Sequence, residues 1–199
     1  VSIPKQILSE EQNGFIPHNI HLKLELKELC YSIKEKKGKG KYMKEILKDV
    51  NVEFNSGRLT AIIGPSGAGK TTLLNILSGF RKQNFKGCIT LNGEKQNQRD
   101  LRIISSYIPQ EFEMHPLLTI RETLLTAANL KLETKISQWK KIAMVNDIVE
   151  LLGMKKVENT FVGKLSGGEK KRLSIGIELL TNPPIMLFDE PTRNLKMYE

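Results

Sequence analysis

One octapeptide constrains this chain more than any other segment. Residues 64–71 read GPSGAGKT and match the pattern G-x-x-x-x-G-K-[ST] at every fixed position. The apolar run Leu59–Ile63 precedes them, which predicts a strand buried on both faces. A helix is predicted from about Lys70 to Ser78, with Gly79 as its stop. The chain should therefore pass from strand to glycine-rich loop to helix here.

The glycines of this octapeptide allow successive backbone N–H groups to turn inward, toward the oxygens of a bound phosphate. The first turn of the helix adds a partial positive charge. Lys70 would reach the β- and γ-phosphates of a nucleotide, and Thr71 would offer its hydroxyl to Mg²⁺. The residues predicted to contact the nucleotide are Gly64, Pro65, Ser66, Gly67, Ala68, Gly69, Lys70, Thr71 and Thr72. The competing interpretation, a glycine-rich turn with an accidental lysine, does not account for the flanking pattern.

Two further motifs lie downstream. Residues 165–169 read LSGGE, where Ser166 can cap a helix running to about Leu180 and adjacent glycines leave a second helix N-terminus open to an anion. Taken alone, this motif is equally compatible with a simple cap and turn. The apolar strand Ile185–Phe188 then delivers two carboxylates, those of Asp189 and Glu190. Asp189 would hold Mg²⁺ through water, and Glu190 would polarise an attacking water as the catalytic residue.

The remaining pattern predicts an α/β domain with a helical insert near residues 112–165. Alternation of apolar and charged residues predicts a strand from Leu22 that continues to Ile33. The other predicted strands are 46–54, 87–92 (closed by an Asn92–Gly93 turn) and 103–108, and the other predicted helices are 118–130 and 137–152, with Gly153 as a cap.

Composition excludes some classes of protein. The 199 residues carry a formal charge of +9 and contain no run near the roughly 18 apolar residues of a membrane helix. The densest basic run, Lys34 to Lys41, is interpreted as a solvated hairpin loop, because no RNA-binding motif or aromatic platform accompanies it. No nucleic-acid partner is therefore expected. Cys30 and Cys88 lack metal-ligand spacing and are interpreted as reduced thiols.

Together, GPSGAGKT, LSGGE and the apolar strand ending in Asp189-Glu190 resemble the ATPase domain of ATP-binding cassette (ABC) transporters over roughly residues 22–192. The stretches GRLTAIIGPSGAGKTTLLNILSG, HPLLTIRETLLTAANLKL and LSGGEKKRLSIGIELLTNPPIMLFDEPT resemble the G subfamily of half-transporters, in its sterol- and lipid-exporting branch. The resemblance implies a P-loop NTPase fold with an N-terminal antiparallel β-subdomain and a helical signature subdomain at about 112–180. It further implies a flexible lead-in at 1–21 and an incomplete ABC domain at 22–199, without its C-terminal strands.

The resemblance also implies roles for individual residues. Gln110, in YIPQEF, would sense the γ-phosphate and Mg²⁺ and couple to the membrane domain. Ile33 takes the position of the family's adenine-stacking aromatic, with Tyr31 and Tyr42 as substitutes. Ser166, Gly167 and Gly168 would contact the nucleotide of a second ABC ATPase domain in a head-to-tail dimer. ATP, Mg²⁺ and a G-subfamily transmembrane domain are the other implied partners, on the cytoplasmic face of a membrane.

The sequence departs from the family after Thr192. The family continues with Ser-Gly-Leu-Asp, whereas this chain has Arg193 to Lys196, so a lysine replaces the D-loop aspartate. The switch histidine has no counterpart, because His18, His21 and His115 all precede Asp189. We therefore expect a truncated or alternatively spliced product, an incomplete gene product or a fragment. Its hydrolysis should be impaired, and its sheet should have an uncovered edge.

Two alternatives stay open at this point. One is a soluble ABC ATPase acting on ribosomes or DNA, although such proteins pair two cassettes or carry a coiled-coil insertion. The other is a nucleotide-binding fragment that dimerises with a full-length transporter and dampens it. The transported substrate contacts residues of the membrane domain, so only family likeness indicates sterol or phospholipid.

Overall fold

A computed structural model describes residues 21–37, 40–80 and 85–191 of the chain. The chain divides into two compact units, residues 1–105 and 106–199. We call them the strand-rich unit and the helical unit. The predicted lead-in at 1–21 lies outside the described residues except for His21, as do His18 and the D-loop segment with Lys196.

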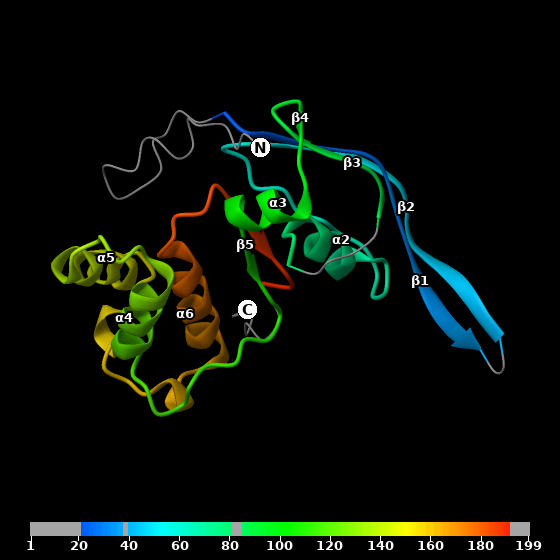
Figure 1. The fold of residues 1–199 in the computed structure, drawn as a ribbon. Helices are drawn as coiled ribbons and strands as arrows, with labels where there is room; N and C mark the ends of the chain where they lie inside the picture. The colour runs from blue at the N-terminus through cyan, green and yellow to red at the C-terminus, as the bar shows by residue number, and fades with distance from the viewer. Residues whose placement is uncertain (1–20, 38–39, 81–84, 192–199) are drawn as a thin grey trace. The chain divides into compact units, whose positions relative to one another are not determined.

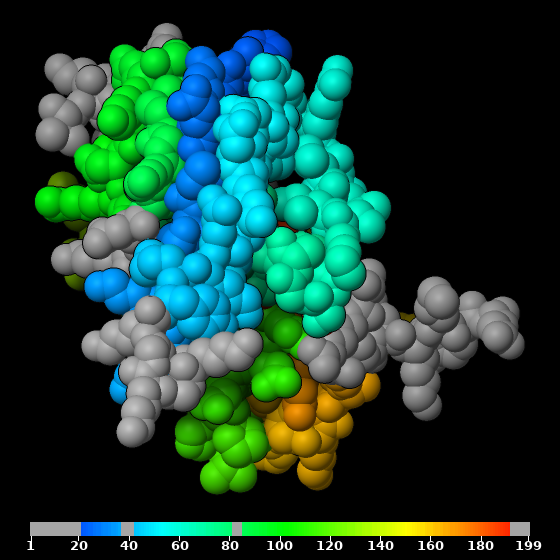
Figure 2. All heavy atoms as spheres, turned by 90° about the vertical axis from the view of Figure 1, so that its right-hand side faces the viewer, coloured from blue at the N-terminus to red at the C-terminus, as the bar shows by residue number. Residues whose placement is uncertain are grey.

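An antiparallel sheet dominates the strand-rich unit (Figure 1). Strand β1 (Lys23–Lys37) pairs with β2 (Gly40–Asn55) on one side and with β3 (Lys86–Leu91) on the other, and β3 pairs with the short β4 (Glu94–Lys95). Figure 2 shows β1 and β2 lying side by side as blue and cyan atoms. The predicted N-terminal antiparallel β-subdomain is therefore present in the structure.

The predicted alternation of side chains sets which face of β1 is buried. Leu24 and Leu26 are buried, and their cross-strand partners Leu91 and Ile89 are buried too. Residues at alternate positions on a strand point to one face, so these four side chains form a continuous apolar patch. The Asn92–Gly93 turn closes β3 as predicted, with both residues at positive φ (50° and 83°).

The basic run lies in a hairpin as predicted, but much of it is strand rather than loop. Lys34 and Lys36 are exposed but lie within β1. Glu35 stabilises this far end of the hairpin, because it accepts hydrogen bonds from Tyr42 and Lys44 of β2. Such cross-strand pairs stabilise a hairpin even where its faces are polar. The tip at residues 38–39 is outside the described residues.

The predicted strand at Leu59–Ile63 is wrong for this structure. Residues 58–65 form neither helix nor strand, and the side chains of Leu59 and Ile63 are 96% and 92% exposed. An apolar run becomes a strand only when neighbouring strands take its N–H and C=O groups. Among the described residues, none of the assigned strands pairs with this segment.

The sequence prediction also missed a short helix. Helix α2 (Lys70–Leu77) follows the glycine-rich loop as predicted, and Gly79 ends it with φ 59°. Ile103 and Ile104, however, belong to helix α3 (Gln98–Ile104) rather than to a strand. The cause is a capping box, in which Asn97 accepts from the N–H of Asp100 at 3.0 Å and Asp100 accepts from the N–H of Asn97 at 3.4 Å.

The helical unit combines two strands with three longer helices. Strands β5 (Ser105–Ile108) and β6 (Ile185–Phe188) form a two-stranded sheet. Helices α4 (Ile120–Lys131), α5 (Gln138–Leu151) and α6 (Gly167–Leu179) begin and end within two residues of the predicted bounds, with 3₁₀ turns at Lys155–Val157 and Val162–Lys164. Gly153 caps α5 at φ 63°, as predicted.

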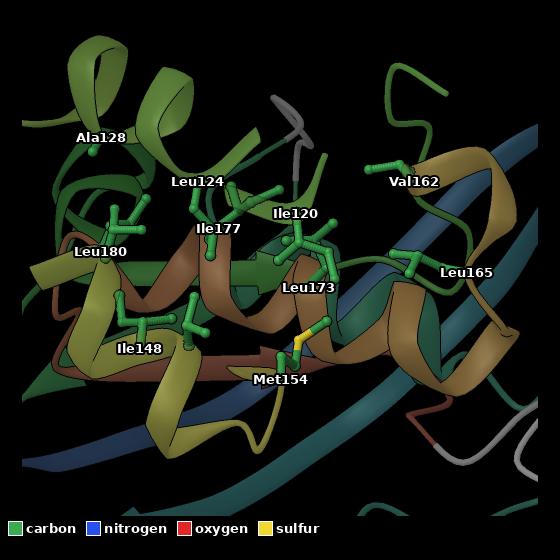
Figure 3. Close-up of a cluster of buried hydrophobic side chains, with 12 residues drawn as sticks. Ile120, Leu124, Ala128, Ile148, Met154, Val162, Leu165, Leu173, Ile177 and Leu180 are labelled. Atoms are coloured by element: carbon green, nitrogen blue, oxygen red, sulfur yellow. The ribbon is translucent and has the colours of Figure 1, made fainter. Parts of the chain in front are cut away.

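The core of the helical unit lies where α4, α5 and α6 face one another, as Figure 3 shows. Leu124, Val145 and Leu173 contribute one fully buried side chain from each helix. The helices approach closely at Gly176, where an added Cβ would lie 2.9 Å from Leu152 Cδ1. Among the described residues, the structure has no helix long and apolar enough to cross a membrane.

This core should dominate the stability of the helical unit. We expect Leu124→Ala to lower the free energy of unfolding by about 2–5 kcal/mol, because it removes buried methyl groups and leaves a cavity. The matched control is Leu130→Ala in the same helix, where the side chain is 81% exposed and the loss should stay within about 0.5 kcal/mol. Urea titration followed by circular dichroism measures both, and equal losses would contradict the assignment of this core.

Candidate functional site

The glycine-rich loop of the strand-rich unit presents its backbone to solvent. Residues 64–68 are exposed, and the loop closes through a hydrogen bond from Ala68 N to Pro65 O at 3.2 Å. Gly69 precedes α2 as its N-cap, with φ 92° and ψ 7°, and no side chain caps the helix. The N–H groups at the start of α2 therefore have no side-chain cap, which suits an anion.

Gly69 is held in place by its neighbours as well as by its backbone angles. A Cβ added to Gly69 would lie 2.9 Å from Leu47 Cδ2 and 3.1 Å from the carbonyl oxygen of Ile46. A φ of 92° is also strained for any residue with a Cβ. Glycine at this position therefore lets the loop pack tightly against β2, and this contact fixes where α2 begins.

Lys70 places a positive charge on the loop. Its ammonium donates hydrogen bonds to the carbonyl oxygens of Gly64 and Pro65, both at 2.9 Å. The two bonds hold the charge beside the loop backbone and the N-terminus of α2, so amides, helix dipole and ammonium share one region. Thr71 is exposed and Thr72 is half-buried, both in the first turn of that helix.

Ile33, the predicted adenine-contacting residue, lies half-buried in β1 opposite Lys44, and Tyr31 lies opposite Leu47. Because Leu47 packs beside Gly69, this part of the hairpin neighbours the glycine-rich loop. Tyr42 instead donates its hydroxyl hydrogen bond to Glu35. The structure thus puts Tyr31 and Ile33 in the part of the sheet beside the loop and gives Tyr42 a different partner.

Asp189 occupies a buried position directly after β6. It is 4% exposed, its backbone N donates to Ile108 O at 3.0 Å, and its Oδ2 accepts from the hydroxyl of Tyr107 at 3.0 Å. Both bonds come from the last residues of β5, so the ends of the two strands fix one carboxylate. Sequence reasoning missed Tyr107, and only the pairing of β5 with β6 could have revealed it.

Glu190 differs from its neighbour in both exposure and backbone. Its residue is exposed, and its φ of 45° lies in the left-handed region. That conformation costs a residue with a Cβ about 1–2 kcal/mol. Such strain is concentrated at functional sites, where a side chain must be aimed in a particular direction. The backbone of Glu190 is thus unusual at the position predicted to be catalytic.

Gln110 follows β5 and Pro109, and it is half-buried. The carbonyl oxygen of Pro109 accepts a hydrogen bond from Lys171 Nζ at 2.9 Å, which connects α6 to this loop. Burial lowers the pKa of Lys171, and the nearby negative charge of Asp189 opposes that change. The predicted residues Gln110 and Asp189 thus share a neighbour, Lys171, that the sequence prediction did not select.

The LSGGE segment begins α6 with a capping box. Ser166 is the N-cap of this helix. Its hydroxyl donates to Glu169 Oε2 at 2.7 Å, and its backbone N donates to the same oxygen at 2.8 Å. In return, the backbone N of Glu169 donates to Ser166 Oγ at 3.3 Å. The pKa of Glu169 is lowered, most by the bond from the Ser166 hydroxyl and next by the bond from the Ser166 backbone N. Ser166 therefore donates to Glu169 here. The pattern S-x-x-E would have revealed this.

The residues predicted to hold Mg²⁺ carry oxygen donors, the ligands that this ion takes. The described residues contain no group of three or more His, Cys, Asp or Glu side chains that could hold a metal ion. Mg²⁺ needs less from the protein, because it takes one or two oxygen ligands together with substrate phosphates and water. Within the helical unit, the buried carboxylate of Asp189 and the half-buried amide of Gln110 are oxygen donors of this kind, and within the strand-rich unit the exposed Thr71 carries a hydroxyl.

Comparison with known proteins identifies the family. The sequence model of the ABC transporter family matches residues 47–193. The chain is 40% identical to ABC transporter G family member 17 of Arabidopsis thaliana over 159 residues, covering 77% of this chain and 24% of that one. It is 41% identical to ABC transporter G family member 1 of Dictyostelium discoideum over 170 residues, covering 82% of this chain and 21% of that one.

A solved structure shows the same fold. It is the dimeric structure of a post-hydrolysis state of the ATP-binding cassette MJ0796 bound to ADP and Pi, with a TM-score of 0.70. The sequences are 28% identical, and the match covers 87% of this chain and 76% of that one. The fold is therefore that of a P-loop NTPase of the ABC type.

This chain belongs to the ABC transporter family. It is an ABC-type ATPase domain, a nucleotide-binding module, and it spans 21–24% of the length of the G family relatives named above.

The capping box of α6 predicts a pH-dependent contribution to stability. The pKa of Glu169 is lowered in the folded chain, so its contribution is complete above the ordinary glutamate pKa and is lost as pH falls through the lower, folded value. We expect the unaltered chain to have a higher thermal midpoint than Glu169→Gln at pH 7. This difference should shrink toward pH 3.5.

Glutamine can still complete a capping box, so the Glu169→Gln comparison isolates the charge. Glu150→Gln, at an exposed position of α5, is the matched control and should leave the midpoint unchanged. A difference between the unaltered chain and Glu169→Gln that stays constant with pH would contradict the role assigned to the carboxylate.

Proposed function

We propose that this chain is the ATP-binding and ATP-hydrolysing domain of a G-subfamily ABC half-transporter. It would couple ATP to the transport of lipid- or sterol-like molecules across a membrane. The observation that carries the proposal is the loop at 64–70, where exposed backbone, an N-terminus without a side-chain cap and a lysine ammonium occupy one place. The names of the relatives support the assignment to the G subfamily.

The proposal assigns each of the predicted residues a role toward Mg-ATP. Backbone N–H groups of residues 66–71 donate to the phosphates. The ammonium of Lys70 gives up its hydrogen bonds to the carbonyls of Gly64 and Pro65 and donates to the β- and γ-phosphate oxygens instead. Ile33 packs against the base. Mg²⁺ would neutralise phosphate charge, held by Thr71 and, through water, by Asp189 and Gln110. The exposed Glu190 orients and polarises the water that attacks the γ-phosphate.

We further propose that two such domains form the complete catalytic unit. The solved relative is described as a dimer bound to ADP and Pi. In a corresponding dimer of this domain, Ser166, Gly167 and Gly168 would face the partner's nucleotide. The Ser166 hydroxyl bonds Glu169 at 2.7 Å, so contact with a phosphate would require it to change partner. Within a whole transporter, a transmembrane domain would be the second partner and would hold this domain at the cytoplasmic face.

Binding of a fluorescent ATP analogue tests the proposal. We expect Lys70→Ala to weaken binding at least about tenfold, because hydrogen bonds to charged groups contribute about 1.5–3 kcal/mol each. Lys86→Ala is the matched control, since Lys86 is an exposed lysine of β3 and its loss should leave the dissociation constant unchanged. Equal affinity of Lys70→Ala and the unaltered chain would overturn the proposed site.

The same preparation separates binding from hydrolysis. Glu190→Gln should retain nucleotide affinity and lose about 10²–10⁴-fold in turnover relative to the unaltered chain under the same conditions. Turnover of Glu190→Gln equal to that of the unaltered chain would remove Glu190 from the mechanism while leaving the binding site intact.

A further inference from the structure

We propose that Lys171 is a positioning residue of the ATPase reaction, one that fixes the backbone from which Gln110 extends and thereby its placement relative to Asp189. This inference rests on the proposed roles of Gln110 and Asp189 toward Mg²⁺. It adds a residue of α6 to the part of the site contributed by the helical unit. Every contact that supports it lies within that unit.

The end of β5 is held by consecutive residues. The side chain of Tyr107 donates to Asp189 Oδ2 at 3.0 Å, and the backbone carbonyl of Ile108 accepts from Asp189 N at 3.0 Å. The carbonyl of Pro109 then accepts from Lys171 Nζ at 2.9 Å. The first two contacts fix β5 against Asp189, and the third fixes the last residue before Gln110.

Proline at 109 makes the Lys171 bond more effective as a constraint. The ring of Pro109 restricts its φ to about −65°, so ψ is the remaining backbone torsion that directs its carbonyl, and the bond from Lys171 restrains that torsion. An anchored Pro109 carbonyl therefore limits where the following backbone can go. Gln110 is the next residue, so its backbone position is restricted as well.

The ammonium of Lys171 lies in a half-buried environment and has a protein partner. The residue is half-buried, and its pKa is lowered by burial while the charge of Asp189 acts in the opposite direction. A lysine that only solubilised the helix would extend into water. Here the ammonium instead donates a hydrogen bond to the carbonyl of Pro109, the residue directly after β5.

The location of Lys171 on α6 gives the contact a second consequence. It lies five residues after Ser166, within the same helix whose N-terminus carries the LSGGE motif. Leu173 and Ile177 bury the helix in the core of the helical unit. Because the helix is rigid, Lys171 connects the backbone before Gln110 to the element that presents Ser166.

The test measures how strongly Mg²⁺ improves nucleotide affinity. The dissociation constant of a fluorescent ATP analogue is measured with EDTA and with saturating Mg²⁺, and the ratio of the two values reports the metal contribution. Lys171→Met preserves side-chain length but removes the donor and the charge. We expect the ratio to fall about tenfold, as when the outer residues that orient metal ligands are lost. Affinity in EDTA should change less than threefold.

Three further variants make this test specific. Lys171→Arg keeps a cationic donor and should restore at least half of the lost ratio. Lys156→Met removes the same charge from an exposed position of the helical unit and should leave the ratio unchanged. If Lys171→Met fails to fold, Lys171→Gln provides the second route, since it keeps the side chain polar but removes the charge and the reach to the Pro109 carbonyl, and it should lower the ratio similarly.

The outcomes separate this inference from the proposed function. Failure of the unaltered chain to bind the analogue would refute the proposed function itself. Binding with a normal Mg²⁺ ratio in Lys171→Met, or in Lys171→Gln where Lys171→Met does not fold, would overturn the role of Lys171 and leave the proposed function standing. A ratio equally reduced in Lys171→Met and Lys171→Arg would overturn the hydrogen bond to Pro109 as its cause.

Discussion

The glycine-rich loop depends most on one packing constraint, the close contact of Gly69 with β2. A methyl group there would meet Leu47 and the backbone of Ile46, and the backbone angles themselves require glycine. The start of α2, the position of Lys70 and the direction of the loop all depend on this contact with β2. The hairpin thus supports the glycine-rich loop, although its own lysine-rich strands are largely polar.

A comparable constraint operates in the helical unit. Asp189 is buried, and a buried carboxylate is stable only when other groups satisfy it. Tyr107 and the pairing of β5 with β6 meet part of that requirement, and they fix the carboxylate at the ends of both strands. The three-helix core around Leu124 and Leu173 then holds α6 in place. Both units therefore use packed elements to position short polar segments.

Local patterns predicted the helices other than α3, the hairpin and the glycine-rich loop that leads into α2, because each depends on residues close in sequence. The capping residue Ser166 and the glycines at 79 and 153 define helix ends within a residue or two. Prediction failed where structure depends on distant partners or on a competing local signal. Leu59–Ile63 is apolar enough for a buried strand, but a strand also needs neighbours. Asn97 caps helix α3, whose last residues were predicted as strand because they begin the apolar run at 103–108.

The same distinction applies to the site. The types of residue at Lys70, Asp189 and Glu190 could be recognised from motifs, whereas Tyr107 and Lys171 act through contacts between residues 62–82 positions apart in sequence. No period or motif reveals such pairs. The capping role of Glu169 could have been predicted from S-x-x-E, but the interpretation of Ser166 as an anion donor displaced it.

The most direct test of the central claim, that the contact of Gly69 with β2 shapes a loop able to hold a triphosphate, is nucleotide binding by Gly69→Ala. Titration with a fluorescent ATP analogue would compare it with Gly57→Ala, which adds the same methyl group at a φ of 72° where nothing lies within 4 Å. We expect Gly69→Ala to weaken binding at least about tenfold while circular dichroism shows a folded chain, and Gly57→Ala to leave the dissociation constant unchanged. Equal affinity of folded Gly69→Ala and the unaltered chain would contradict the claim.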